Sequence, residues 1–323
     1  MADFDVFNGD ADGITALLQL RLAEPRAAQL ITGIKRDIAL LQRVVQQRAA
    51  SGDRVAVLDL SLDKNRTALE QLLAVEAEVF YCDHHFAGQL PHSSRLLSLI
   101  NESPEVCTSL LVNGYLRGRY APWAVVGAYG DNLHQSAARL AAQIGLSQAE
   151  RAALCELGEL LNYNGYGESL ADLHFDPADL YRQMSPFSSP LALLAANPPF
   201  IAALREGRAA DSAALAEAKT LLHSDIGIVK QLPNRAWARR ISGVWANQLA
   251  RDNPHQAIAL LTEREGGYLV SVRAPRAQPR GAVELCQQFA GGGGRAAAAG
   301  INVLPEAEKT QFIEKLSTHF NAL

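Results

Sequence analysis

An apolar run that ends in charged side chains is the feature of this sequence that most restricts its fold. Residues 79–82 are valine, phenylalanine, tyrosine and cysteine, and Asp83, His84 and His85 follow directly. Polar groups gain nothing from burial at the end of a strand, so we expect a charged ligand in front of them. In open α/β sheets that position is the crevice beyond the carboxyl ends of the strands. The plainer alternative is that Asp83 caps the next segment and both histidines are ordinary loop residues.

Two other strand-like runs in the first hundred residues also end at acids. Residues 4–7 lead through a glycine-containing turn into Asp10 and Asp12, and residues 55–58 end at Asp59. The repetition favours a shared site over three unrelated loops, because the carboxyl ends of parallel strands meet at one edge of a sheet.

A fourth apolar stretch, residues 127–130, brings out Asp131. Aspartates from separate segments repel one another unless a cation gathers them. A set of carboxylates with one histidine and no cysteine suits Mn²⁺ or Mg²⁺ better than zinc. The sequence therefore predicts a metal site built from strand ends.

Strand-like and helix-like runs alternate through this part of the chain. Apolar spacing predicts helices between the strands, over residues 14–23, 38–49 and 63–75, and a strand over 29–34. Strands that alternate with helices of this length predict βαβ units and a parallel sheet. Further helices are predicted over 108–115, 122–131 and 136–161.

The length of 323 residues allows two domains that each bury a core. We predict an α/β protein in three parts: a parallel-sheet N-terminal domain at 1–185, a helical connector at 186–225, and a smaller α/β substrate-binding domain at 226–323. The connector is placed by four prolines between 185 and 200 and a predicted helix at 201–223. A hairpin with strands at 257–261 and 268–273 is the clearest element of the last part.

Composition is ordinary for a globular protein, with 48% hydrophobic and 20% charged residues. The four cysteines form no CxxC pair, and the N-terminus shows no secretory signal, so we expect a cytoplasmic protein that does not engage a membrane. The net charge is −4, yet residues 230–300 hold ten Lys/Arg against four Asp/Glu. This excess indicates either a solvated surface or a basic wall that receives a polyanion.

The C-terminal part also carries candidate phosphate-binding residues. Ser271 and Arg273 alternate on one predicted strand and so face the same side. In the glycine-rich run, Gly293 and Gly294 let backbone N–H groups approach an anion closely, especially if the run opens a helix, and Arg295 adds a charge. The alternative is that such a run serves close packing.

Taken together, these motifs resemble the DHH phosphoesterase superfamily. That superfamily includes RecJ-type exonucleases, nanoRNase/pAp-phosphatases, cyclic-di-AMP phosphodiesterases and manganese inorganic pyrophosphatases. Asp83-His84-His85 matches the name-giving motif, and Asp10-x-Asp12-Gly13, Asp59 and Asp131 match the others in order. Residues 293–300 are similar to the signature of the DHH-associated C-terminal domain, so the resemblance covers both ends of the chain.

The resemblance implies a two-metal centre of Mn²⁺, or Mg²⁺, although one or two ions remain open. A second metal would be bound by Asp12, Asp59, His84 and Asp131. Asp59 would bridge to a first metal that Asp10 also binds. His85 would face the scissile phosphate as hydrogen-bond donor or general acid, with Asp83 as its catalytic neighbour.

Two residues depart from the family pattern. Asn8 stands where a histidine usually completes the first metal site, and a neutral amide is a weaker ligand for Mn²⁺. We expect a weakened two-metal site rather than a single resident ion, because Asp10 is retained and has no other evident role. Arg295 stands where the C-terminal signature usually has histidine, which leaves anion binding intact but puts the kind of substrate in question.

The leading functional prediction is a metal-dependent phosphoesterase that acts on a phosphorylated nucleotide or a short single-stranded oligonucleotide. RecJ-like exonuclease activity and cyclic-dinucleotide hydrolysis both fall within it. Polyphosphate or pyrophosphate hydrolysis is the alternative among enzymes. A nucleotide-binding regulatory protein with weakened catalysis is the alternative from another class. A homodimer is compatible with the sequence, which does not fix the oligomeric state.

Overall fold

The computed structural model describes residues 2–323, and the chain divides into two compact units at 1–206 and 207–323. Residues 186–206, the first part of the predicted connector, belong to the first unit. The division into three parts, with a connector at 186–225, stays a prediction.

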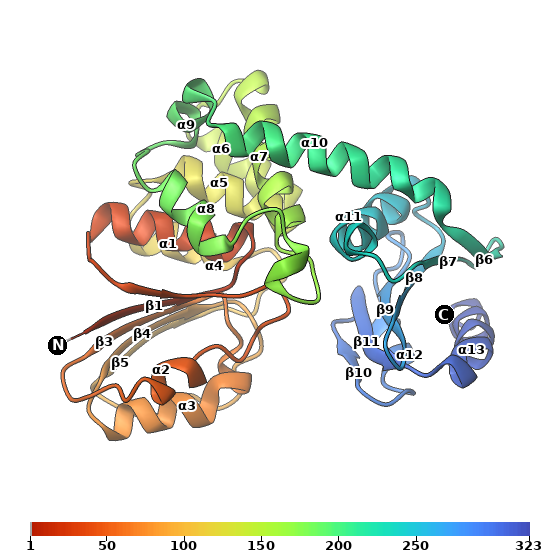
Figure 1. Cartoon of the computed structure of the whole chain (residues 1–323), viewed down its shortest axis with the longest axis horizontal. Helices are drawn as coiled ribbons and strands as arrows, with labels where there is room; N and C mark the ends of the chain where they lie inside the picture. The colour runs from red at the N-terminus through yellow and green to blue at the C-terminus, as the bar shows by residue number, and fades with distance from the viewer. Residues whose placement is uncertain (1) are drawn as a thin grey trace. The chain divides into compact units, whose positions relative to one another are not determined.

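As predicted, the first unit is built on a parallel sheet; it has five strands in the order β2-β1-β3-β4-β5 (Figure 1). Its strands are β1 (Asp3–Phe7), β2 (Gln29–Ile31), β3 (Arg54–Leu58), β4 (Glu78–Asp83) and β5 (Leu96–Ile100).

Helices cover both faces of this sheet (Figure 1). One face carries α1 (Ala11–Ala23) and α4 (Thr108–Tyr115), with α5 (Ala121–Gly130) and α7 (Gln148–Asn164) packed behind them; the other carries α2 (Gln42–Gln46) and α3 (Leu62–Ala74). The remaining helices are α6 (His134–Gln143), α8 (Pro177–Met184), α9 (Pro190–Ala196) and α10 (Pro199–Ala213).

Alternate residues of the central strands fill two separate cores. Phe7 and Leu58 pack on the α1 side, whereas Val57 and Tyr81 pack on the α3 side, and all four side chains are fully buried. Burial on both faces explains why these strands read as unbroken apolar runs.

The strand order creates a switch point between β1 and β3. From β1 the chain runs through α1 to β2 on one side, and it then returns past β1 to β3 on the other side. The helices that follow β1 and β3 lie on opposite faces of the sheet. The loops that leave the two carboxyl ends therefore diverge, which opens a crevice there.

Several predicted helices differ from the structure. The helix predicted over 38–49 is reduced to α2, and the single stretch over 136–161 is divided into α6 and α7 by Gly145, whose φ of 74° ends the first of them. The helix predicted over 201–223 stops at Ala213, and residues 219–223 form an edge strand instead. Strand β5 was not predicted.

The second unit is a mixed sheet of six strands in the order β10-β11-β9-β8-β7-β6, in which only β7 and β8 run parallel. Its strands are β6 (Lys219–His223), β7 (Gly227–Leu232), β8 (Ala257–Arg264), β9 (Gly267–Arg273), β10 (Gly292–Gly294) and β11 (Ala298–Leu304). Helix α11 (Ala236–Asp252) covers one face, and α12 (Ala282–Cys286) and α13 (Lys309–Asn321) cover the other. The predicted hairpin is confirmed as β8–β9.

Candidate functional site

The ends of β1, β3 and β4 lie side by side. Phe7 is paired with Leu58, and Leu58 with Cys82. The ladder continues one step further, because the Asn8 N–H donates to the Leu58 carbonyl at 3.2 Å and the Asp59 N–H to the Cys82 carbonyl at 3.1 Å. The residues that follow the three strands therefore stand next to one another at the switch point.

Asp10 caps α1 and fixes the loop after β1. Its Oδ1 accepts the N–H groups of Asp12 at 3.0 Å and Gly13 at 3.1 Å. A Cβ at position 13 would lie 2.2 Å from the Asn8 carbonyl oxygen, so only glycine fits there. The close approach of loop and helix sets the direction in which Asp12 points.

Asp12 is held by the first residues of α4. Its two carboxylate oxygens accept the N–H of Thr108 at 2.8 Å and of Ser109 at 2.7 Å. The amino end of a helix favours a negative charge. Even so, burial raises the pKa of Asp12, and the nearby Asp131 raises it further.

Asp59 adopts an uncommon backbone conformation, with φ at 59° in the left-handed region. The Thr108 hydroxyl donates to its Oδ1 at 3.2 Å, and only 2% of the residue is exposed. Burial raises the pKa of Asp59 well above its usual range, and Asp12 and Asp10 add to the shift. The strained backbone thus presents a carboxylate that is costly to keep ionised unless a cation is near.

His84 turns one ring nitrogen towards this group. Its Nδ1 lies 2.8 Å from the Val106 carbonyl, which can only accept, so Nδ1 carries a proton and Nε2 is the nitrogen available to a metal ion. Nε2 is 3.5 Å from an oxygen of Asp59, 3.8 Å from Asp131 and 4.0 Å from Asp12. A divalent metal ion placed among this nitrogen and the three carboxylates would be attracted to all four groups. Metal-bound histidines usually donate their other N–H in this way.

Asp131 completes the group from the carboxyl end of α5. A helix carboxyl end disfavours an anion, so a cation is needed there too. Ligand atoms of Asp12, His84 and Asp131 lie within 4.8 Å of one another, and so do those of Asp59, His84 and His85. This donor set of carboxylates and imidazole fits Mn²⁺ or Mg²⁺.

His85 and Asp83 form a separate pair beside the carboxylates. Their Nδ1 and Oδ1 atoms are 2.7 Å apart, and Asp83 is fully buried while 33% of the His85 side chain is exposed. Burial lowers the pKa of His85, but the bond to Asp83 and the charges of Asp83 and Asp59 together outweigh it and raise the pKa above its ordinary value. Burial raises the pKa of Asp83, but the hydrogen bonds and charge of His85, with a contribution from His84, together outweigh it and lower the pKa.

Lys35 belongs to the site and was not predicted. Its Nζ forms an ion pair with Asp10, donates to Asn162 Oδ1 at 2.9 Å and lies 3.8 Å from an oxygen of Asp131. Burial lowers the pKa of Lys35, but Asp10, Tyr166 and Asp131 together outweigh it, so the pKa lies well above its ordinary value. The available signal was its position directly after the predicted strand at 29–34.

Asn8, a predicted metal ligand, is 3% exposed and donates from Nδ2 to the Lys35 carbonyl at 3.1 Å. Within residues 2–323 its Oδ1 is buried without a hydrogen-bond partner. The structure brings the predicted site residues of the first unit together. The metal, catalytic and substrate roles predicted for the site residues stay predictions.

The predicted phosphate-binding residues of the second unit lie on two strands and a turn. Ser271 and Arg273 are on β9 and point away from the core that holds Val270 and Val272; Arg273 Nε donates to Asn247 on α11 at 2.8 Å. Gly293 and Gly294 are in β10, and the exposed Arg295 begins the turn to β11. The run does not open a helix, since residues 292–294 pair as a strand with β11.

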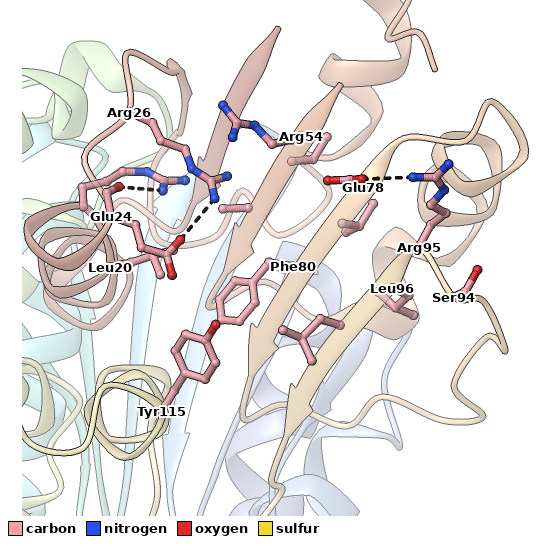
Figure 2. A pocket seen from close by; sticks show the side chains of 15 residues that line it. Leu20, Glu24, Arg26, Arg54, Glu78, Phe80, Ser94, Arg95, Leu96 and Tyr115 are labelled. Carbon is pink, nitrogen blue, oxygen red and sulfur yellow. Dashed lines mark hydrogen bonds and ion pairs between the residues drawn. The ribbon is translucent and has the colours of Figure 1, made fainter. Parts of the chain in front are cut away.

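A hollow of about 450 Å³ lies elsewhere in the first unit (Figure 2). It is lined by the beginnings of β3 and β4, where Arg54 is bound to Asp3 at 2.7 Å and the rings of Phe80 and Tyr115 are 5.3 Å apart. It contains none of the clustered strand-end acids, and Arg21, another lining cation, is paired with Asp5. A hollow by itself therefore does not identify the functional site.

No helix within residues 2–323 is long and apolar enough to cross a membrane.

Comparisons with known proteins identify the fold. No protein-family model matches the chain, and no curated protein matches it. Solved structures do match. RecJ exonuclease bound to manganese has a TM-score of 0.63 and 18% identity, over 100% of this chain and 90% of that one. The pGpG-specific phosphodiesterase PggH from Vibrio cholerae has a TM-score of 0.56 and 14% identity, over 100% and 99%. An exopolyphosphatase-related protein from Bacteroides fragilis has a TM-score of 0.52 and 16% identity, over 99% and 93%. The chain thus has the fold of the DHH phosphoesterase superfamily, as its motifs predict.

Proposed function

We propose that this protein is a metal-dependent phosphoesterase that hydrolyses phosphate esters of small nucleotides or short oligonucleotides. The observation that carries the proposal is the orientation of His84, whose Nε2 faces oxygens of Asp59, Asp131 and Asp12 at 3.5–4.0 Å. Together with His84, these three carboxylates would hold Mn²⁺ or Mg²⁺.

A divalent ion bound there supplies an activated water and offsets charge on the phosphoryl oxygens. The chain itself holds the ligands in place: α4 amides fix Asp12, and the Val106 carbonyl fixes the His84 ring. Such fixed groups need no reorganisation during the reaction.

His85 is the proposed proton donor. Asp83 engages its Nδ1, which leaves Nε2 for a substrate, and 33% of the side chain is exposed. The raised pKa keeps the ring protonated to higher pH, so it can donate to the leaving oxygen. Asp83 is fully buried and acts through His85 as a positioning residue.

The nature of the similar proteins supports the substrate class, since RecJ is named as an exonuclease and PggH as a phosphodiesterase of pGpG. The local excess of Lys/Arg over Asp/Glu in residues 230–300 supports a phosphate-rich ligand for the second unit. We assign phosphate binding there to Ser271, Gly293 and Gly294, with Arg273 and Arg295 as the charged groups.

One assay tests the proposal. The purified protein with Mn²⁺ is offered pAp, pGpG, cyclic dinucleotides, short RNA and DNA, pyrophosphate and polyphosphate. We expect hydrolysis of a phosphate ester that stops in a chelator and returns with Mn²⁺. If only pyrophosphate and polyphosphate were cleaved, the substrate would be a phosphoanhydride and not a phosphate ester. Undiminished turnover in the chelator would remove the metal from the mechanism.

A further inference from the structure

A lysine stands inside the acidic cluster. Lys35 Nζ contacts Asp10, Asn162 and Asp131, which come from the cap of α1, the end of α7 and the end of α5. Only 23% of its side chain is exposed. Three separate elements therefore converge on one ammonium group.

The backbone of Lys35 is fixed on both sides. Its N–H donates to the Gly165 carbonyl at 2.8 Å, and its carbonyl accepts from Asn8 Nδ2 at 3.1 Å. The Tyr166 ring centroid lies 5.7 Å from Nζ. A Cβ at Gly9 would come within 1.9 Å of the Gly33 carbonyl oxygen, so the loop after β1 is pressed against the segment that carries the lysine.

These contacts give a role to residues 162–167, an Asn/Tyr/Gly segment to which the sequence assigns no function. Asn162 accepts from the ammonium, Gly165 accepts from the Lys35 N–H, and Tyr166 presents its ring to the charge. The segment therefore positions Lys35 from both of its halves: residues 162–164 belong to the last turn of α7, and residues 165–167 follow it.

The lysine uses the carboxylate that a first metal would need. Asp10 Oδ1 accepts two backbone N–H groups, and Oδ2 is paired with Lys35. Among the described residues, Asp10 is in neither of the two groups of side chains that could hold a metal ion. The premise that Asp10 has no role apart from a first metal is therefore wrong.

We propose that the Lys35 ammonium is a built-in cation that takes the place of the first metal, so that the centre holds one divalent ion. The inference rests on the proposed function, because it concerns the same site. Asn8 fits this arrangement, because its amide donates to the Lys35 carbonyl and so helps to hold the backbone that carries the ammonium. A second divalent ion beside Asp10 would meet the ammonium at close range and be repelled.

The test counts metal ions and does not depend on turnover. The full-length protein is equilibrated with excess Mn²⁺ without substrate, and bound manganese per chain is measured by mass spectrometry. Electron paramagnetic resonance then distinguishes isolated from coupled ions. We expect one isolated Mn²⁺ per chain in the wild type and in Asn8→His, because both retain the lysine.

The double variant Asn8→His/Lys35→Met should bind two coupled ions, a rise from one to two per chain. Lys64→Met is the matched control, since Lys64 is 59% exposed and its Nζ pairs with the neighbouring Asp63, and it should retain one ion. Asn8→His keeps the test independent of whether the double variant folds.

Two ions in the wild type would overturn the lysine proposal and leave the proposed phosphoesterase intact. Two ions in Asn8→His alone, or one in a folded double variant, would also overturn it. No bound manganese in any variant would overturn both this inference and the metal centre on which it rests.

Discussion

The acidic cluster of the first unit and the glycine-rich edge of the second are built in opposite ways. In the cluster, Asp12, Asp59 and His84 are 0%, 2% and 4% exposed, and backbone groups or neighbouring hydroxyls fix each of them. At the edge, Arg295 is exposed on a turn, and a Cβ at Gly293 would have no heavy atom within 4 Å. Catalysis requires side chains that are already held in position, whereas side chains at an exposed edge can adapt to a ligand.

The difference has an energetic consequence. Like charges buried together oppose folding until a cation joins them, as the raised pKa values of Asp12 and Asp59 indicate. An exposed arginine costs little, because solvent and salt screen it. Substitutions in the cluster should therefore change both rate and stability, and those at the edge should change binding alone.

The largest expected effect is on turnover in Asp59→Asn. The substitution keeps the shape but removes a ligand charge, so we expect kcat to fall about 10³-fold, the scale of several kcal/mol of transition-state stabilisation. Steady-state kinetics with Mn²⁺ measures this. Asp63→Asn on the surface of α3 is the control, and it should keep full activity. A less than tenfold loss in Asp59→Asn would place the reaction elsewhere.

His85→Gln should lower kcat about 10²-fold, the lower range for a lost general acid. In the wild type, the rate should fall as pH rises through the raised pKa of His85, because the proton donor is then lost. In Asp83→Asn this fall in rate should occur at lower pH, since the contact with Asp83 raises the pKa of His85. A pH–rate profile that is the same in wild type and Asp83→Asn would remove this pair from the mechanism.

In the metal-free protein, Asp59→Asn should raise the stability of the fold, although the same substitution lowers activity. The pKa of Asp59 is raised in the folded state, so the folded protein loses stability as pH rises from the unfolded pKa towards the folded one. Above both values the full cost of the ionised carboxylate remains. Metal-free Asp59→Asn should therefore be more stable than the wild type at pH 8, by on the order of 1 kcal/mol, the size of a typical substitution effect.

Denaturant unfolding in a chelator at several pH values checks this prediction. The difference between the two proteins should shrink as pH falls below the folded pKa of Asp59, because a protonated carboxyl resembles an amide. Added Mn²⁺ should reverse the order by stabilising the wild type. A variant that is less stable at every pH would show that Asp59 is not strained by burial of its charge.

The sequence predicts most of the cluster because local patterns carry it. Apolar runs that end at Asp59 and Asp83 are visible without a structure, and parallel pairing then brings them together. The lysine contact is different: Asn162 is 127 positions from Lys35, and only the packing of α7 joins them. The Val106 carbonyl that orients His84 is a backbone group, which has no signature in the side-chain sequence.

Prediction from the sequence meets the same limit at an edge of the second unit's sheet. Residues 219–223 follow an alanine-rich helix and extend its helical pattern, yet they form strand β6, because hydrogen bonds to β7 outweigh local propensity. The glycine-rich run could have been read as a helix start or a strand. Pairing with β11 decides, since a Cβ at Gly294 would lie 2.5 Å from the Cα atom of Ala299 on β11 and only glycine permits that approach.

The smallest expected effect is at that edge, in Arg295→Ala. If Arg295 binds a substrate phosphate equally in the ground and transition states, KM should rise about three- to tenfold with kcat unchanged, because one exposed charge-assisted hydrogen bond is lost. The increase should diminish as salt is added. Arg276→Ala, another exposed arginine of the same unit, is the matched control and should leave KM unchanged. Arg273→Ala should also raise KM, but it additionally breaks the contact with Asn247 and so is the less specific probe. Equal KM values for wild type and Arg295→Ala would mean that the exposed edge does not contact the substrate, and that the cluster alone selects it.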